Sequence, residues 1–571
     1  MIERVNDEIS KTRIRRIVRL RKRRKTSGGG SFRDGTALAV IYLALVVMVS
    51  LAISFLVPGT IGAPSKEATM SHTVAVDVAV MVCAGICGRL ALGKFAPEIL
   101  ARNSRLLMLG VVAVFSDLLC ATAVHLGTEY FAIAMPGPRS VGDDAACAHA
   151  AAMFLPYLFA PSLATLLAGA GGGISLGLAL AVQNVLFVPH SAGLAAALCG
   201  VFAAIAAPLA VSGVHRRGPF ASRLAALGLV QIFGLFFAVW AIPGFSGRLW
   251  AASCKDPAAT VRFVRISLFA IALALAASPA ASLALLPPLE RVFATCSAIQ
   301  LDRWADLSNP LLRRLSLEAP GTFHHCLMVA NLAETAAEAI GADPLLSRVA
   351  SYYHDIGKLS APEKFTENIG FGGVNPHDSL SPAMSALILA AHVRDGMAMA
   401  DADKLPAPVR AIIAEHHGTS SMAFFLDKAR RQAEAKAAQD GSEPEPIDEN
   451  RFRYAGPRPT TAESAVVMLA DSVEAASRSL ANPDPSVLEK KVDAIVGAKI
   501  RDGQLDDSPL SFADAVAIRR SFSSTLATAL HGRISYPGDK EPDQAAAAKG
   551  AAQQAQRNEG QDGEPVRKTA D

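Results

Sequence analysis

The sequence has few aromatic residues, few charges and no paired cysteine motif. Phe, Trp and Tyr make up 6% of the 571 residues and charged residues 19%, whereas 51% are hydrophobic. The chain is too long for one ordinary domain, and its composition is too apolar for a purely soluble protein. The eight cysteines show no CxxC spacing, so neither a zinc ribbon nor a thioredoxin-like site is predicted. Alternating strand patterns are also lacking, which favours an all-α fold over a mainly β one.

The apolar residues are unevenly distributed along the chain. Up to about Pro288 they form long uncharged blocks, whereas from Glu290 onward they recur at helical spacing among charges. This contrast predicts a polytopic helical membrane half followed by a soluble, all-helical half. Eight stretches approach the ~20 residues that a helix needs to cross a bilayer: 36–57, 72–92, 105–126, 149–169, 173–190, 192–213, 221–244 and 264–287. The fifth and sixth are nearly contiguous, so a re-entrant hairpin is an alternative for one of them.

Ten Lys or Arg residues lie between Lys11 and Lys25, with no acid among them. Such a run could bind nucleic acid, but directly before an apolar span it is typical of a cytoplasmic flank facing anionic lipid. With eight crossings, both chain ends are then expected in the cytoplasm, and no nucleic-acid polymer is expected as a partner. A disulfide between Cys147 and Cys254, both in loops expected outside, is an open alternative.

Two carboxylates lie within the apolar stretches, where an unpaired charge is costly. Asp77 and Asp117 could therefore be functional, as in a transporter, or each could form a hydrogen bond between helices. Gln183 and Asn184 are expected to join helices in the same way.

The soluble half contains a dense group of histidines. Seven of the thirteen lie between Phe323 and Gly418, and one opens the string His354-Asp355-Ile356-Gly357-Lys358. Imidazoles combined with carboxylates and no thiolate suit Mn, Fe or Zn, and two such ions sharing one carboxylate can clamp a displacement at phosphorus. We expect Asp355 to be shared, and the metal ligands to be His325, His354, Asp355, His392, His416, His417 and Asp471.

Each expected ligand also has an ordinary structural alternative. His417 could support another ligand, and Asp471 could pair with Arg478. Lys358 is expected to stabilise charge on phosphoryl oxygens as a catalytic residue, but it could equally be a surface lysine. Substrate contacts are expected from His324 and His377.

The helices that would carry these residues have local start and stop signals. Helices are predicted over 330–340, 344–353, 382–395, 408–417 and 464–480, with a solvated loop at about 432–450. Thr460 and Glu463 form a capping-box pattern before the last of them.

Several motifs, taken together and in order, resemble the bacterial membrane-bound HD phosphodiesterases with a seven-helix transmembrane receptor-like region, the PgpH type. The motifs are Leu311 to Arg314, Glu318 to His325, Tyr352 to Lys358, Asn375 to Asp378, Glu415 to Thr419 and Leu469 to Arg478. The resemblance implies hydrolysis of cyclic di-AMP to the linear dinucleotide at a centre of two ions, usually Mn or Fe. The sequence departs from this family between Pro58 and Ser71. In such proteins a large extracytoplasmic domain usually follows the first membrane span, whereas this sequence allows only a short loop there.

The resemblance leaves the substrate open among cyclic di-AMP, cyclic di-GMP, a pyrophosphorylated nucleotide and a dNTP, and a receptor that binds without catalysis is a further alternative. His325, His354, Asp355 and Asp471 are expected on one ion, and Asp355 with His392, His416 and His417 on the other. A homodimer is compatible with these features. The expected organisation is a basic segment 1–35, a membrane domain 36–288, a linker 289–310, an HD domain 311–537 in the cytoplasm, and a disordered tail 538–571.

Overall fold

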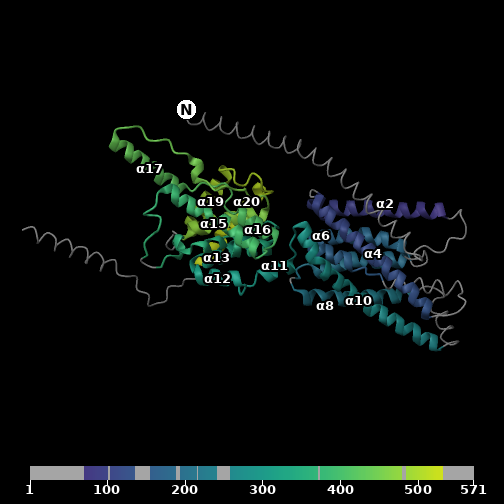
Figure 1. The fold of residues 1–571 in the computed structure, drawn as a ribbon. Coiled ribbons are helices and arrows are strands. Elements are labelled where there is room, and N and C mark those ends of the chain that lie inside the picture. The colour runs from purple at the N-terminus through teal and green to yellow at the C-terminus, as the bar shows by residue number, and fades with distance from the viewer. Residues whose placement is uncertain are drawn as a thin grey trace, which may run out of the picture.

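The computed structural model places a bundle of long apolar helices beside a compact helical domain (Figure 1). It describes residues 70–100, 103–134, 155–187, 193–214, 216–240, 257–370, 373–478 and 484–531. The basic segment, the expected span 36–57, Cys147, Cys254 and the tail after 531 lie outside the described residues. The described residues form helices, turns and one isolated β-bridge, between Ser421 and Arg453, which confirms the all-α prediction.

The membrane half matches most of the expected spans. Its helices are α2 (Met70–Phe95), α3 (Pro97–Leu100), α4 (Asn103–Ala134), α6 (Phe159–Gln183), η1 (Asn184–Phe187), α7 (Gly193–Val211), α8 (Arg217–Trp240) and α10 (Pro257–Phe293). Among the described residues, three helical stretches are long and apolar enough to cross a membrane: Val78–Phe95, Asn103–Ala123 and Phe159–Gln183.

The last of these stretches, α6, folds back on itself at Gly169. That residue has φ 77° and ψ 172°, a conformation that favours glycine. A Cβ placed on Gly177 would lie 3.0 Å from Pro161, although sixteen residues of continuous helix would separate the two by about 24 Å. The expected spans 149–169 and 173–190 therefore correspond to two antiparallel limbs of a hairpin, helical over 159–168 and 170–183. At about 1.5 Å per residue, each limb is too short to cross a bilayer alone.

A buried side-chain hydrogen bond joins α4 to α6. The Nε2 of Gln183 donates to Oδ1 of Asp117 at 2.6 Å, and both residues are almost fully buried. Asp117 thus has the interhelical role given above as an alternative to transport. The side chain of Asp77 is not among those that the structure describes.

The soluble half consists of helices around a large apolar core and a smaller apolar cluster. They are α11 (Ala298–Trp304), α12 (Pro310–Glu318), α13 (Pro320–Ala339), α14 (Pro344–Tyr353), η3 (Ile356–Ser360), η4 (Pro362–Lys364), η5 (Thr366–Asn368), α15 (Pro382–Ala402), α16 (Ala407–Glu415), α17 (Ala423–Asp440), η6 (Glu449–Phe452), α18 (Ala462–Ser477), α19 (Pro485–Arg501) and α20 (Phe512–His531). The core is built from α12, α13, α14, α16, α18, α19 and α20.

Local signals account for α14, the helix that delivers the central motif. Asp343 accepts a hydrogen bond from the Leu346 amide, and Pro344 occupies the first helical position. The preceding helix ends just before Gly341, at φ 70°. Both boundaries agree with the sequence prediction.

Two local predictions were wrong. Residues 432–440 continue α17 instead of forming a loop, because Ala437 is buried and alanine is a strong helix former. The cap of α18 is Thr461, whose hydroxyl accepts from the Ser464 amide, whereas Thr460 bonds to Glu415. Glu463 accepts from the Asp343 amide, so the predicted capping box does not form.

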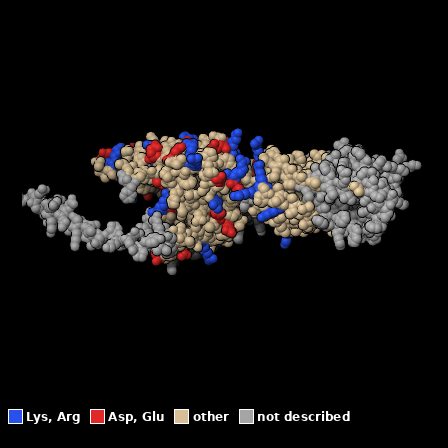
Figure 2. Space-filling view, turned by 90° about the horizontal axis from the view of Figure 1, so that it is seen from below, with Lys and Arg blue, Asp and Glu red and all other residues tan. Residues whose placement is uncertain are grey.

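The segment expected to link the two halves is ordered. The helix α10 continues to Phe293, and α11 follows after a short turn at the boundary seen in Figure 1. On the face shown in Figure 2, Lys and Arg side chains gather where the halves meet. Arg216, which directly precedes α8, lies 3.7 Å from Asp302 of α11.

Candidate metal centre

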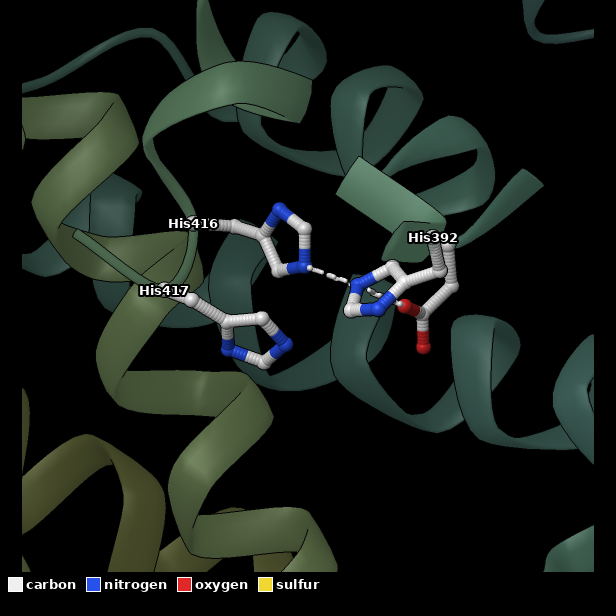
Figure 3. A group of neighbouring side chains, drawn as sticks. His392, His416 and His417 are labelled. Carbon is white, nitrogen blue, oxygen red and sulfur yellow. Dashed lines mark hydrogen bonds and ion pairs between the residues drawn. The ribbon is translucent and has the colours of Figure 1, made fainter. Parts of the chain in front are cut away.

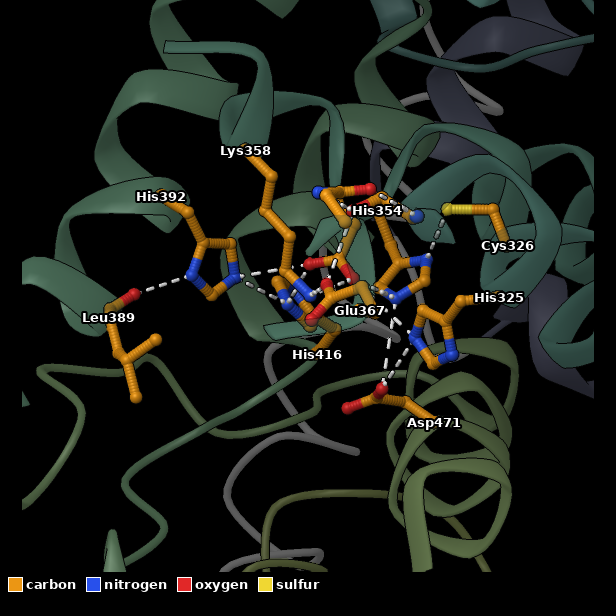
Figure 4. Close-up of polar contacts among 12 residues, drawn as sticks. His325, Cys326, His354, Lys358, Glu367, Leu389, His392, His416 and Asp471 are labelled. Atoms are coloured by element: carbon orange, nitrogen blue, oxygen red, sulfur yellow. Dashed lines mark hydrogen bonds and ion pairs between the residues drawn. The ribbon is translucent and has the colours of Figure 1, made fainter. Parts of the chain in front are cut away.

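The seven expected metal ligands come from five helical elements and lie in two adjoining groups. Figure 4 shows His325, His354, His392, His416 and Asp471 pointing toward one another. The ligand positions are His325 in α13, His354 and Asp355 at the end of α14, His392 in α15, His416 and His417 directly after α16, and Asp471 in α18. The structure therefore brings together every residue that the sequence predicted for the centre.

One group of ligand atoms consists of His325, His354 and Asp471, whose atoms all lie within 4.8 Å of one another. The Nε2 of His325 is 3.0 Å from Oδ1 of Asp471, and Nε2 of His354 is 3.8 Å from the same oxygen. Three donors converging at this spacing could hold one ion.

A second group consists of Asp355, His392, His416 and His417 (Figure 3). The Nε2 atoms of His392 and His416 are 3.2 Å apart, and Oδ1 of Asp355 lies 3.3 Å from His392. The Nδ1 of His417 faces the other oxygen of Asp471 at 3.5 Å. His417 is thus within the cluster, on its more exposed side.

Asp355 lies between the two groups. Its Oδ2 is 3.2 Å from His354 and 3.4 Å from His325, while its Oδ1 faces His392 and His416. This is the arrangement expected of a carboxylate that bridges two ions. The grouping also agrees with the predicted division of ligands.

The buried polar atoms of the cluster fit metal ions. Nε2 of His354 and Oδ1 of Asp355 are fully buried and have no hydrogen-bond partner. Such atoms are costly unless they are coordinated or paired. With no sulfur among the seven ligands, this oxygen and nitrogen set suits Mn or Fe.

Backbone carbonyls orient three of the histidines. The Nδ1 atoms of His354, His392 and His416 each lie 2.5 to 2.8 Å from the carbonyl three residues earlier in the chain. A carbonyl only accepts, so each Nδ1 carries the proton and each Nε2 presents a lone pair to the centre. Two such lone pairs, on His392 and His416, face each other at 3.2 Å and would repel without a cation between them.

Glu474 supports His325 and was missed by the sequence analysis. Its Oε2 accepts from Nδ1 of His325 at 2.5 Å, and it also pairs with Arg478. Arg478 therefore bonds to Glu474 and not to Asp471, the alternative considered above. The only sequence signal was its position three residues after Asp471, on the same face of α18.

We expect Glu474→Gln to weaken Mn²⁺ binding about 10- to 100-fold, because the charge that orients and polarises His325 is lost. The measurement is a calorimetric Mn²⁺ titration of the full chain. The control is Glu434→Gln, at an exposed site on α17. Equal affinities of Glu474→Gln and the unaltered protein would show that His325 needs no such support.

The electrostatics of the centre keep its ligands ready for metal. Burial, and then the nearby charge of His354, lower the pKa of His416 to about 3. Burial and His416 hold the pKa of His417 well below its usual value. Burial alone would raise the pKa of Asp355, but Lys358 and His354 outweigh it and hold that pKa well below its usual value. His392, His416 and His417 are thus held as neutral imidazoles and Asp355 as a carboxylate, the forms that bind metal. Burial lowers the pKa of His325 and of His354, but the neighbouring carboxylates outweigh it and raise both pKa values, so these two rings would release a proton when a metal binds.

Lys358 lies beside the bridging carboxylate and not on the surface. Its Nζ is 2.9 Å from Oδ2 of Asp355 and 2.7 Å from Oε1 of Glu367. Burial disfavours the ammonium, but the two carboxylates outweigh it and raise the pKa of Lys358. A permanent positive charge therefore borders the centre on its open side, where Lys358, Glu367, His417 and Asp471 keep 10 to 19% of their side-chain surface exposed.

The two residues expected to contact substrate lie outside the cluster. His324 is exposed on α13. His377 is buried, with Nε2 2.8 Å from the Lys364 carbonyl and its ring against Phe425. His377 therefore ties the segment after η3 to α17, which is a structural contact.

We expect His377→Ala to keep the metal content of the unaltered protein and to lower its thermal stability, because the change removes a buried hydrogen bond and a ring contact. The loss should be about 1–3 kcal/mol. Elemental analysis and thermal unfolding measure the two effects. A metal-free variant would mean that the ring belongs to the centre.

The part of the chain that contains these residues is similar to known proteins. Residues 322–476 match the family model described as HD domain, so the chain contains an HD domain. It is 41% identical over 261 residues to the cyclic-di-AMP phosphodiesterase PgpH of Bacillus subtilis (strain 168), a match that covers 46% of this chain and 35% of that protein. The cyclic-di-AMP phosphodiesterase PgpH of Listeria monocytogenes serotype 1/2a (strain 10403S) is 38% identical over 256 residues, a match that covers 45% of this chain and 34% of that protein.

A solved structure matches the same region. The L. monocytogenes PgpH HD domain in complex with cyclic-di-AMP is 37% identical and covers 39% of this chain and 99% of that chain, with a TM-score of 0.36. The chain spans about a third of the length of the two curated relatives. The sequence identities to the two curated relatives, together with the match to the HD-domain model, confirm the resemblance to the PgpH proteins.

Proposed function

We propose that this protein is a membrane-anchored, metal-dependent phosphodiesterase that hydrolyses cyclic di-AMP to linear pApA. The observation that carries the proposal is the buried Asp355, whose two oxygens face two separate groups of ligand atoms. The names of the B. subtilis and L. monocytogenes relatives support the choice of substrate.

The residues of the centre fit this reaction. Two Mn or Fe ions, when bound, supply a Lewis acid for the phosphoryl oxygens and activate a water. Nε2 of His354, His392 and His416 would hold the ions, and the hydrogen bonds from Nδ1 to the backbone fix the orientations of these rings. Lys358 offers its ammonium to the negative charge that develops at phosphorus. Glu367, which holds Nζ from the other side, keeps this ammonium in place.

The membrane half is proposed to anchor the enzyme in the lipid bilayer. In this scheme residues 36–288 form a multi-pass domain, and the HD domain, 311–537, lies in the cytoplasm, where an intracellular messenger is found. The two long apolar stretches Val78–Phe95 and Asn103–Ala123 support the anchoring, and the basic residues at the boundary of the halves support the orientation.

The proposal is tested with the full chain in lipid nanodiscs and Mn²⁺. Cyclic di-AMP, cyclic di-GMP, a pyrophosphorylated nucleotide and a dNTP are supplied separately, and products are separated by chromatography. We expect pApA from cyclic di-AMP at a rate at least about tenfold above the others, a difference of ~1.4 kcal/mol in transition-state binding. Preferential turnover of another nucleotide would reassign the substrate. Binding without turnover would favour a receptor.

A further inference from the structure

The short helix α11 belongs to two apolar cores. Ile299 is 4% exposed and packs in the core of the membrane half, in the same cluster as Met108 and Leu289. Two residues later, Leu301 is 1% exposed and packs in the core of the soluble half. A helix of seven residues that is buried on both sides cannot move relative to one half without disturbing the other.

The end of α11 is bonded to the helix that carries the bridging carboxylate. Trp304 is the last residue of α11, so its carbonyl has no intrahelical donor. The hydroxyl of Tyr353 donates to this carbonyl at 2.9 Å, and the two rings meet edge to face at 5.9 Å. Tyr353 is fully buried and ends α14, directly before His354 and Asp355.

We infer that Tyr353 is a positioning residue through which the membrane half, acting by way of α11, sets the place of His354 and Asp355 in the metal centre. The inference rests on the proposed function. Tyr353 and the two ligands leave the same end of α14, so a shift of α11 moves the ligands as well. Ligand sites tolerate displacements of only about 0.5 Å, and an error of 1 Å costs about a hundredfold in rate.

The first test removes only the hydroxyl that joins the two helices. Tyr353→Phe in the full chain, in nanodiscs, should lower Mn²⁺ affinity and kcat about tenfold each, with KM nearly unchanged. Tyr352→Phe is the matched control, because it removes the neighbouring hydroxyl of α14, which bonds to Arg348 on the same helix. Tyr352→Phe should change both quantities less than twofold. Equal effects of the two variants, or no effect of Tyr353→Phe, would overturn the inference.

The second test asks whether the effect passes through α11. Ile299→Ala changes a contact in the membrane half, and Ile299→Val serves if the first variant does not accumulate. Either substitution at Ile299 should lower kcat when Tyr353 is present. In a protein that already carries Tyr353→Phe, the same substitution should leave kcat nearly unchanged, because the hydrogen bond between Tyr353 and Trp304 is already lost. Additive effects, or no effect of either substitution, would overturn the inference.

A failure of the proposed function is recognised separately. If the unaltered protein hydrolyses no cyclic dinucleotide, the function is wrong, and the same two tests are then scored by Mn²⁺ affinity. The inference still requires that Tyr353→Phe and Ile299→Ala weaken that affinity without adding to each other.

Discussion

Replacing Asp355 by alanine is expected to reduce turnover at least about a thousandfold, or ~4 kcal/mol of transition-state stabilisation. The reason is geometric, because Asp355 is the residue whose two oxygens face both groups of ligands. Its loss also leaves the ammonium of Lys358 with Glu367 as its one remaining carboxylate partner among the described residues. Elemental analysis should find at most one ion per chain.

The control for this change is Asp378→Ala, in the second His-Asp dipeptide of the chain. Asp378 is exposed and bonds to Asn375, so the control should keep two ions and full turnover. If Asp355→Ala retained two ions, or turned over substrate at the unaltered rate, Asp355 could not be the bridge.

A methyl group at Gly357 is expected to disrupt the centre almost as severely. A Cβ there would lie 1.9 Å from the His392 carbonyl and 2.4 Å from the Gly396 amide nitrogen, both backbone atoms of α15. Since neither atom can rotate away, η3 and α15 must separate, and His392 moves from its place beside Asp355. Gly357→Ala should lose about 3 kcal/mol of stability and at least about a hundredfold in rate.

Thermal unfolding and Mn²⁺ titration measure these losses in the full chain. The matched control is Gly370→Ala, because an added Cβ at that glycine meets no atom within 4 Å. Gly370→Ala should behave as the unaltered protein. Normal stability and metal binding in Gly357→Ala would mean that the two helices have room to separate without harm.

The metal centre could be predicted from sequence because its ligands sit at recognisable places. Asp343 and Pro344 start α14, which leaves His354 and Asp355 at its end, and a buried carboxylate such as Asp471 needs a partner. Gly357 is part of the central motif, and its importance is the close approach of α15. That approach depends on a contact with residues 35 or more positions away, which no local pattern reveals.

Other features depend on the same kind of distant contact. Glu474 looked like an ordinary helix residue until α13 brought His325 against it. The burial of Ala437 made a helix of residues that read as a loop. In the membrane half, the sequence predicted two separate membrane spans at 149–169 and 173–190. The structure has there the two limbs of α6, which meet at Gly169 and are each too short to cross a bilayer. Likewise, α11 lies in the segment 289–310, which the sequence predicted to be a linker. Its position between the two apolar cores depends on tertiary packing, which the local sequence does not reveal.

The wide spacing of the expected ligands in sequence also fixes when the candidate metal centre can assemble during synthesis. His325 and Asp471 are 146 residues apart in sequence, yet their side chains meet at 3.0 Å. At the usual ~5–20 residues per second, the ribosome adds Asp471 about 7–30 s after His325. Until then α13 and α14 lack α18, the helix that completes the first group of ligands. A nascent chain that has not yet reached Asp471 therefore cannot assemble the complete candidate metal centre.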